Sequence, residues 1–209
     1  LLAQCEHALG HYTEAEAHLL RILEVRGEPR QDDLMALATD QSELEPTRAR
    51  QTLLRALRLN PYNSAVRYQL IDLELPLGAY EQAIEQATEG ITRNPADVSC
   101  CVSRAEAYFR RGRSEDEERL LRDLATAQAK NRKDYNIYRL RGALYQRRAN
   151  RAKQTAEVHR FLHQALEAYA EGITVVPPKF HAHLLALQSR VYLQHKRFDE
   201  AVAQAQRAV

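Results

Sequence analysis

Histidine pairs come nearest, among the residues of this chain, to the spacing that metal chemistry needs. His159 and His163 stand four residues apart, so their imidazoles would share one face of a helix and offer two ligands to a metal ion. No third ligand is obvious nearby, and a surface or packing role fits them better. We therefore predict no metal site, and the same holds for the weaker pairs, which are His7 with His11 and His181 with His183.

Cysteines and carboxylates add no catalytic constellation. Cys5, Cys100 and Cys101 are too few and too badly spaced for a disulfide framework or a zinc site, and we expect them to be small apolar fillers. Glu115 and Glu118 fit a solvated helix start, where negative charge complements the helix dipole. Glycine-rich phosphate loops, nucleophile elbows and HExxH motifs are all missing from the sequence. We predict that the chain is not an enzyme and uses no cofactor.

The elements that carry these residues repeat along the chain with a period of 34 residues. Steps of this length from Ala83 reach similar sequence contexts on both sides, and after one interruption the pattern resumes. Amphipathic segments before and after each of these anchor positions predict two helices per copy. The other anchors are Ala15, Ala49, Glu117, Ala165 and Ala201.

Turn and stop signals recur at fixed offsets from the anchors. Glycine five residues before an anchor suits a left-handed residue between two helices, and proline or glycine twelve residues after it ends the second helix. Thr13 with Glu16 and Ser114 with Glu117 match the capping-box spacing, and Pro46 suits a first helical position. The turn glycines are Gly10, Gly78 and Gly112, and the stop residues are Gly27, Pro61, Pro95 and Pro177.

A 34-residue helix-turn-helix with a small residue, Gly-x-Tyr-x-x-Ala and a closing proline resembles the tetratricopeptide repeat. The early tryptophan often seen in that repeat is missing from every copy, although Tyr138 stands there in the fifth. The resemblance implies an all-α, right-handed α-solenoid of about six repeats and about twelve antiparallel helices, in one domain over residues 1–209. We expect the repeats at residues 1–28, 29–61, 62–95, 96–130, 131–178 and 179–209, in a segment of a longer protein.

Two glycines lie inside predicted second helices, seven residues after their anchors. Gly90 and Gly172 stand where other copies carry Ile22, Ala56 or Leu124. Glycine inside a helix costs about 1 kcal/mol relative to alanine, so a packing reason is needed. We predict that the first helix of the next copy comes close to each of these glycines.

The fifth copy is irregular and basic. Gly142 stands 23 residues before its anchor, where the equivalent residue of other copies stands 12 before, so 11 residues are inserted near 148–160. The inserted segment has no glycine or proline, which favours two extended helices over a long loop. The segment is either a solvated helix surface or a contact for an acidic partner. A nucleic-acid site is the least favoured alternative, because no aromatic residue lies between Tyr145 and Phe161 to stack on bases. Its candidate binding residues are Arg148, Arg151, Lys153 and Arg160.

The resemblance implies that the first helix of each copy lines a concave groove suited to a peptide or a partner helix. The positions predicted to face this groove are mixed early in the chain and rich in arginine later. A chaperone-tail clamp is not expected, because none of the six positions that would supply its asparagine carries one. The candidate contacts are Tyr68, Asp72, Glu106, Phe109, Arg110, Arg139, Gln146, Arg147 and Arg190.

Composition and charge limit the remaining possibilities. The chain of 209 residues is 44% hydrophobic and 28% charged, with no apolar run of membrane-spanning length. Residues 1–50 carry five basic and ten acidic side chains, whereas residues 130–160 carry ten basic and two acidic ones. We predict a non-catalytic, cytoplasmic scaffold that binds a protein or peptide with an acidic segment. The alternatives are an RNA-binding helical-repeat protein and a periplasmic domain of a bacterial secretion or polysaccharide-export system.

Overall fold

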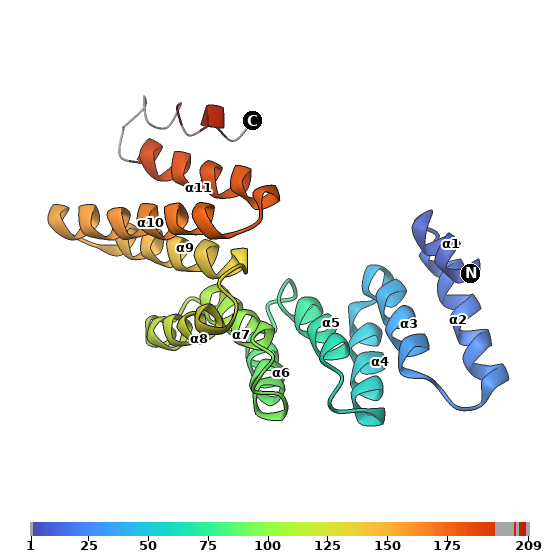
Figure 1. The fold of residues 1–209 in the computed structure, drawn as a ribbon. Coiled ribbons are helices and arrows are strands. Elements are labelled where there is room, and N and C mark those ends of the chain that lie inside the picture. Colours follow the sequence, from blue (N-terminus) through green and yellow to red (C-terminus); the bar gives the residue numbers. More distant parts are fainter. Residues whose placement is uncertain (1, 195–202, 204, 208–209) are drawn as a thin grey trace. The chain divides into compact units, whose positions relative to one another are not determined.

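The structure is a computed structural model that describes residues 2–194, 203 and 205–207. Between Leu2 and Gln194 it contains eleven α-helices, two short 3-10 segments and no strand, and residues 203 and 205–207 are also helical (Figure 1). The elements are α1 (Leu2–Ala8), α2 (Tyr12–Arg26), α3 (Gln31–Leu44), α4 (Pro46–Leu59), α5 (Ser64–Glu74), α6 (Tyr80–Arg93), α7 (Ser99–Arg111), η1 (Ser114–Asp116), α8 (Glu117–Lys130), α9 (Tyr135–Arg151), α10 (Thr155–Val175), η2 (Pro178–Phe180) and α11 (His181–Gln194).

The helices form two compact units, Leu1–Ser103 and Arg104–Val209, which divide within α7. We refer to them as unit 1 and unit 2 and describe each by itself. In both units the helices follow one another in chain order and pack against their sequence neighbours. The all-α architecture expected from the 34-residue period is therefore present.

In unit 1 the anchor alanines lie where helices pack together. Ala15, Ala49 and Ala83 have no exposed surface, which places the anchor position in the packed interior of the unit. The turns that precede Ala15 and Ala83 use Gly10 and Gly78, with φ of 78° and 73°. Residues other than glycine rarely adopt this left-handed backbone conformation, so the prediction for these two turns is confirmed. It is also confirmed for the turn before α8, where Gly112 has a φ of 76°.

Both predicted capping boxes are wrong. α2 begins at Tyr12, so Thr13 is already helical, and no side chain caps this end of the helix. Glu16 instead points into the unit, where it accepts a hydrogen bond from the Gln41 amide at 2.9 Å and pairs with Arg48 at 2.7 Å. The Ser114 side chain caps neither η1 nor α8. Pro46, by contrast, does begin α4.

The close approach predicted at Gly90 is present. A β-carbon built on this residue would lie 2.4 Å from the Cys100 sulfur in α7 and 2.8 Å from Cδ of Arg67 in α5. Both distances are far below an ordinary van der Waals contact. Glycine here lets α6 approach the first helix of the next copy, and the side chain of Cys100 fills the space.

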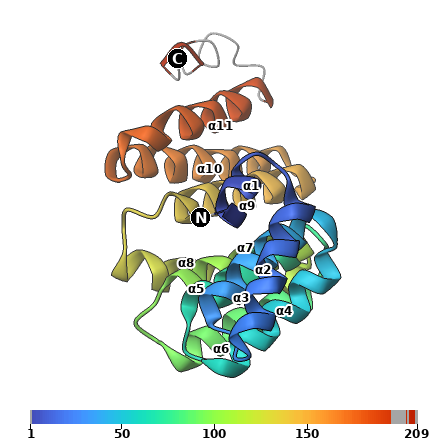
Figure 2. The same ribbon diagram turned by 90° about the vertical axis from the view of Figure 1, so that its right-hand side faces the viewer.

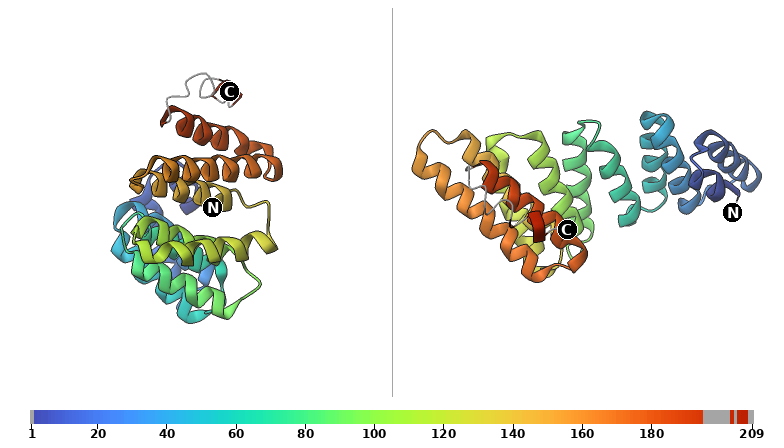
Figure 3. Two further views of the ribbon diagram at one scale, coloured as in Figure 1. Left: turned by 90° about the vertical axis from the view of Figure 1, so that its left-hand side faces the viewer. Right: turned by 90° about the horizontal axis from the view of Figure 1, so that it is seen from above.

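Unit 2 contains the two longest helices, α9 with 17 residues and α10 with 21. They run side by side, with α11 as the next layer (Figures 2 and 3). Only three residues, 152–154, join α9 to α10. The inserted residues therefore extend both helices, as their lack of glycine and proline indicated.

Tyrosine and glycine side chains interlock between α9 and α10. A β-carbon on Gly142 of α9 would lie 2.2 Å from the Tyr169 ring, and one on Gly172 of α10 would lie 2.8 Å from Tyr138 and from Leu184 of α11. Tyr138 and Tyr169 are fully buried. Each tyrosine thus occupies the space left by a glycine on the facing helix, and the approach of α11 predicted at Gly172 is also present. Ala165 is fully buried, whereas Ala201 lies outside the described residues.

Candidate functional site

Polar side chains of α7 and α9 meet around one carboxylate in unit 2. Glu106 accepts a 2.6 Å hydrogen bond from Arg110, one turn further along α7, and a second, short one from Arg139 of α9. The Glu106 side chain is 11% exposed, so both guanidinium groups are held close to a largely buried charge. Burial alone would raise the pKa of this carboxyl, but Arg139 and Arg110 outweigh burial and leave the pKa below its ordinary value.

A second contact between α7 and α9 joins an arginine to an aromatic ring. The Arg147 guanidinium carbon lies 3.7 Å from the centre of the Phe109 ring, and its Nη1 donates to the Phe109 carbonyl oxygen at 2.5 Å. Burial lowers the pKa of this guanidinium. Arg147 therefore fastens α9 to the end of α7 through one hydrogen bond and the face of the Phe109 ring.

The same surface continues from α9 to α11. The Tyr169 hydroxyl donates to the Gln146 side-chain oxygen at 2.8 Å, and the Gln146 amide reaches the Gln194 oxygen at 3.5 Å. Burial raises the pKa of Tyr169, although the nearby charges of Arg139 and Arg190 oppose this effect. Arg190 is exposed and forms no ion pair with any residue in the described part of the chain.

Seven of the nine predicted groove residues belong to unit 2: six take part in these separate contacts, and the charge of the seventh, Arg190, acts on Tyr169. We name them the unit 2 polar surface: Glu106, Phe109, Arg110, Arg139, Gln146, Arg147 and Arg190. Tyr68 and Asp72 are on α5 and belong to unit 1. Asp72 is exposed, and burial together with the neighbouring Asp97 raises the pKa of Tyr68.

An aromatic group that the sequence analysis missed lies between α9 and the start of α11. The rings of Tyr135 and Phe180 stack with their centres 4.8 Å apart, and the His183 ring meets Tyr135 edge-on at 5.4 Å. The Tyr135 pKa is raised by burial, against the effect of Arg139. Since the two segments are 45 residues apart, no local pattern in the sequence indicates the contact.

The basic insertion is partly neutralised by a residue of α8. Arg148 donates to Glu117 at 2.7 Å, and Arg151 donates to the same carboxylate at 3.0 Å and to the Gly112 carbonyl at 3.1 Å. Lys153 and Arg160 are exposed and form no ion pair among the described residues, and Arg160 lies over the Phe161 ring at 4.8 Å. Through these bonds the partly exposed Arg148 and Arg151 tie the end of α9 to Glu117 of α8.

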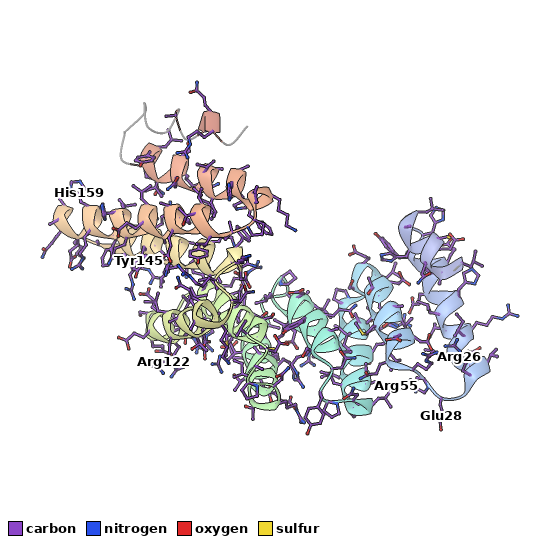
Figure 4. All side chains as sticks on the ribbon, in the orientation of Figure 1. Arg26, Glu28, Arg55, Arg122, Tyr145 and His159 are labelled. Atoms are coloured by element: carbon purple, nitrogen blue, oxygen red, sulfur yellow. The ribbon has the colours of Figure 1, made fainter. Side chains whose placement is uncertain are left out.

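Figure 4 shows His159 near the start of α10, where its side chain is exposed, and the half-buried Tyr145 further back along α9. Histidine, cysteine and carboxylate side chains of the described residues nowhere gather in threes in a way that would hold a metal ion. None of the described helices combines the length and the apolar character needed to cross a bilayer.

Comparison of the chain with protein-family models and with curated proteins yields no match. Solved structures do match. TTC0263, a thermophilic TPR protein of Thermus thermophilus, is 21% identical, with a TM-score of 0.64 over 85% of this chain and 89% of that one. A tetratricopeptide repeat protein from Parabacteroides merdae is 19% identical, with a TM-score of 0.70 over 99% of this chain and 75% of that one. The chain has the tetratricopeptide repeat fold.

A further similar structure is the human IFIT1 dimer with m7Gppp-AAAA, which is 16% identical to this chain with a TM-score of 0.68. That match covers 94% of this chain and 45% of the IFIT1 chain. At these identities the likeness shows the fold, which many functions share. The resemblance proposed from the repeated motif is therefore confirmed at the level of the fold.

Proposed function

We propose that the chain is a non-catalytic interaction scaffold whose unit 2 polar surface binds an acidic segment of a partner protein. The observation that carries the proposal is the charge of this surface, which combines four arginines with a single carboxylate, Glu106. This leaves three positive charges in excess, with which the carboxylates of an acidic peptide can pair. Helical-repeat proteins with this fold offer extended surfaces suited to such segments.

Arg190 is the residue of this surface best placed to meet the partner. Arg110 and Arg139 already share Glu106, and Arg147 is held against Phe109. Arg190 is exposed and its guanidinium has donors to spare, so a carboxylate can pair with it in a bidentate manner. Lys153 and Arg160, at the α9–α10 end, are the corresponding exposed cations of the basic insertion.

The proposal assigns the partner complex to the cytoplasm. Cys5 is exposed, Cys100 and Cys101 are buried, and all three are free thiols. Exposed free thiols suit a reducing compartment. An enzymatic role is not proposed, since no nucleophile, general base and oriented third group come together in the site as described above.

Affinity capture with matched charge reversals tests the proposal. Arg190→Glu would place a negative charge, the wrong sign for an acidic partner, on the unit 2 polar surface. Arg122→Glu makes the same change on an exposed residue of α8 (Figure 4). Proteins retained by the wild type and the Arg122 variant but lost by the Arg190 variant would be the partners. If the two variants retain the same proteins, the unit 2 polar surface is not the contact.

RNA binding is the second candidate, favoured by arginines that lie over aromatic rings at the end of the α9–α10 pair. Arg148 lies over Tyr145 at 5.8 Å and Arg160 over Phe161 at 4.8 Å. Such pairs are found where bases stack on proteins. The IFIT1 structure, which contains m7Gppp-AAAA, has a similar fold. Retention of labelled single-stranded RNA that falls steeply with salt and is lost in Arg160→Glu would favour this function over the first.

A further inference from the structure

The two units carry opposite net charge. Unit 1, residues 1–103, contains nine basic and sixteen acidic side chains, and unit 2, residues 104–209, contains 21 basic and 12 acidic ones. The formal net charges are therefore −7 and +9, which give the +2 of the whole chain. Surfaces of opposite sign attract each other, so unit 1 of one copy is an electrostatic match for unit 2 of another.

Two turns of unit 1 lie side by side. Arg50, near the start of α4, pairs with Glu74, at the end of α5, at 3.1 Å. This contact brings the turn between α3 and α4 next to the turn between α5 and α6, and Figure 1 shows both at the upper side of unit 1. Because α2 packs on α3 and α6 packs on α5, the two turns lie within the row of helices and not at its end. We name them the unit 1 turn surface, with the residues Glu43, Leu44, Glu45, Leu77 and Glu81.

Leucines and carboxylates are mixed on the unit 1 turn surface. Leu44 is 43% exposed and Leu77 52%, and the three glutamates of the surface are exposed as well. The nearby guanidinium of Arg48 is divided between Glu45 at 3.8 Å and Glu16 at 2.7 Å, so it neutralises the surface only in part. An apolar area with a negatively charged rim suits a partner whose apolar area has a positive rim.

The end of the α9–α10 pair has this complementary character. Lys153 and Arg160 are exposed cations without an ion pair among the described residues, and Arg151 is 49% exposed. The half-buried Phe161 ring lies beneath Arg160 at 4.8 Å. This end of the pair therefore offers an apolar ring bordered by positive charge.

We propose that the unit 1 turn surface of one copy binds the α9–α10 end of a second copy of this chain. Leu44 and Leu77 contact the Phe161 ring, and the glutamates around them pair with Lys153 and Arg160. The two contacting surfaces differ, so a copy can bind a second copy through one surface and a third through the other. The contact uses no residue of the unit 2 polar surface and is tested independently of the partner proposed for that surface.

Sedimentation velocity of the full chain measures this self-association. We expect the weight-average sedimentation coefficient of the wild type to rise with protein concentration. At a fixed protein concentration it should fall when NaCl is raised from about 0.1 M to 1 M, because the Debye length shortens from about 10 Å to 3 Å.

Charge reversal on one surface at a time identifies the two sides of the contact. The double variants Glu43→Lys with Glu45→Lys, and Lys153→Glu with Arg160→Glu, should each weaken self-association at least about tenfold, because like charges then face each other. An equimolar mixture of the two double variants should associate again, since the unchanged surface of each variant meets the unchanged surface of the other.

Matched controls separate this contact from general effects of charge and exposure. Arg122→Glu with Arg190→Glu changes the charge of unit 2 by the same amount outside the α9–α10 end, and should leave association nearly unchanged. Leu77→Gln should weaken association about tenfold, because an apolar contact is lost. Leu59, the last residue of α4, is 51% exposed at the other end of that helix, and Leu59→Gln should have no effect. Circular dichroism of all variants checks that the helices remain.

Three results would overturn the proposal. The first is a wild-type chain that stays monomeric up to about 1 mM, a concentration at which even a millimolar Kd would be detected. The second is a mixture of the two charge-reversed variants that associates no more than each variant alone. The third is an equal effect of a contact variant and its matched control, which would place the contact elsewhere on the chain.

Discussion

Replacement of Gly142 by alanine tests how closely α9 and α10 are packed. Helix propensity alone predicts that Gly142→Ala stabilises the protein by about 1 kcal/mol, since alanine is the better helix former. Packing predicts the opposite. The new β-carbon would lie 2.2 Å and 2.4 Å from two carbons of the Tyr169 ring, where ordinary contact needs about 3.5–4.0 Å.

The structure limits how this clash can be relieved. The Tyr169 ring is fully buried and its hydroxyl is held by Gln146, so the ring must move by more than 1 Å (about 1.3 Å from the distances above) together with its surroundings. Overpacking of this kind costs about 1–3 kcal/mol, and we expect a cost of about 2–3 kcal/mol here because the ring cannot move alone. After the gain in propensity is subtracted, we expect a net loss of about 1–2 kcal/mol in the free energy of unfolding.

Thermal unfolding followed by circular dichroism measures the effect. For a chain of this length each kcal/mol lowers the Tm by about 2–4 °C. Tyr169→Leu supplies the control, because the shorter side chain leaves room for a methyl group. In that background Gly142→Ala should be neutral or stabilising. An increase in Tm when the alanine is introduced into the wild-type chain would refute the packing explanation.

Three further predictions concern burial and charge. Ala83→Leu should lower the free energy of unfolding by about 1–3 kcal/mol, measured in urea, because Ala83 has no exposed surface; an unchanged midpoint would contradict the repeat alignment. Glu117→Gln should lower the free energy of unfolding by about 1 kcal/mol and speed amide hydrogen exchange at the end of α9, because Arg148 and Arg151 lose a shared, partly exposed partner. Unchanged exchange would show that these ion pairs do not hold the helix. Burial raises the pKa of Glu74 above its ordinary 4.5, against the effect of Arg50. Near these pH values the native state then binds more protons than the unfolded state. The free energy of unfolding should therefore fall as pH rises from about 4.5 through the raised pKa. Denaturant unfolding of Glu74→Gln, measured at several pH values, should lack this dependence.

Local signals predicted the packing of helices well. Gly90 and Gly172 were expected to meet the next first helix, and both do, because a glycine inside a helix costs stability that only a close contact explains. The left-handed turns at Gly10, Gly78 and Gly112 follow from the same conformational reasoning. The turns and the helix–helix contacts of the fold were therefore predictable from glycines at fixed offsets within the repeat.

Signals that depend on a distant partner were missed. Thr13 and Glu16 have the spacing of a capping box, yet Glu16 turns inward because Gln41 and Arg48, from two other helices, compete for its carboxylate. Arg148 is a candidate contact for a partner in the sequence analysis, and the pairing of its guanidinium with Glu117, 31 residues earlier, could not be foreseen from local spacing.

The interlocked tyrosines of α9 and α10 fix the register of these two helices. Tyr138 rests on Gly172 and Tyr169 rests on Gly142, so a slip of one turn along either helix would bring a ring against a larger side chain. The lock lies within the regular part of the pair and leaves the residues near 148–160 outside it. Residues 153–160, beyond the last arginine that pairs with Glu117, are consequently free of both constraints. A designer could change their length and charge, or exchange them for a foreign recognition segment, while the two rings keep the helices that carry them in place.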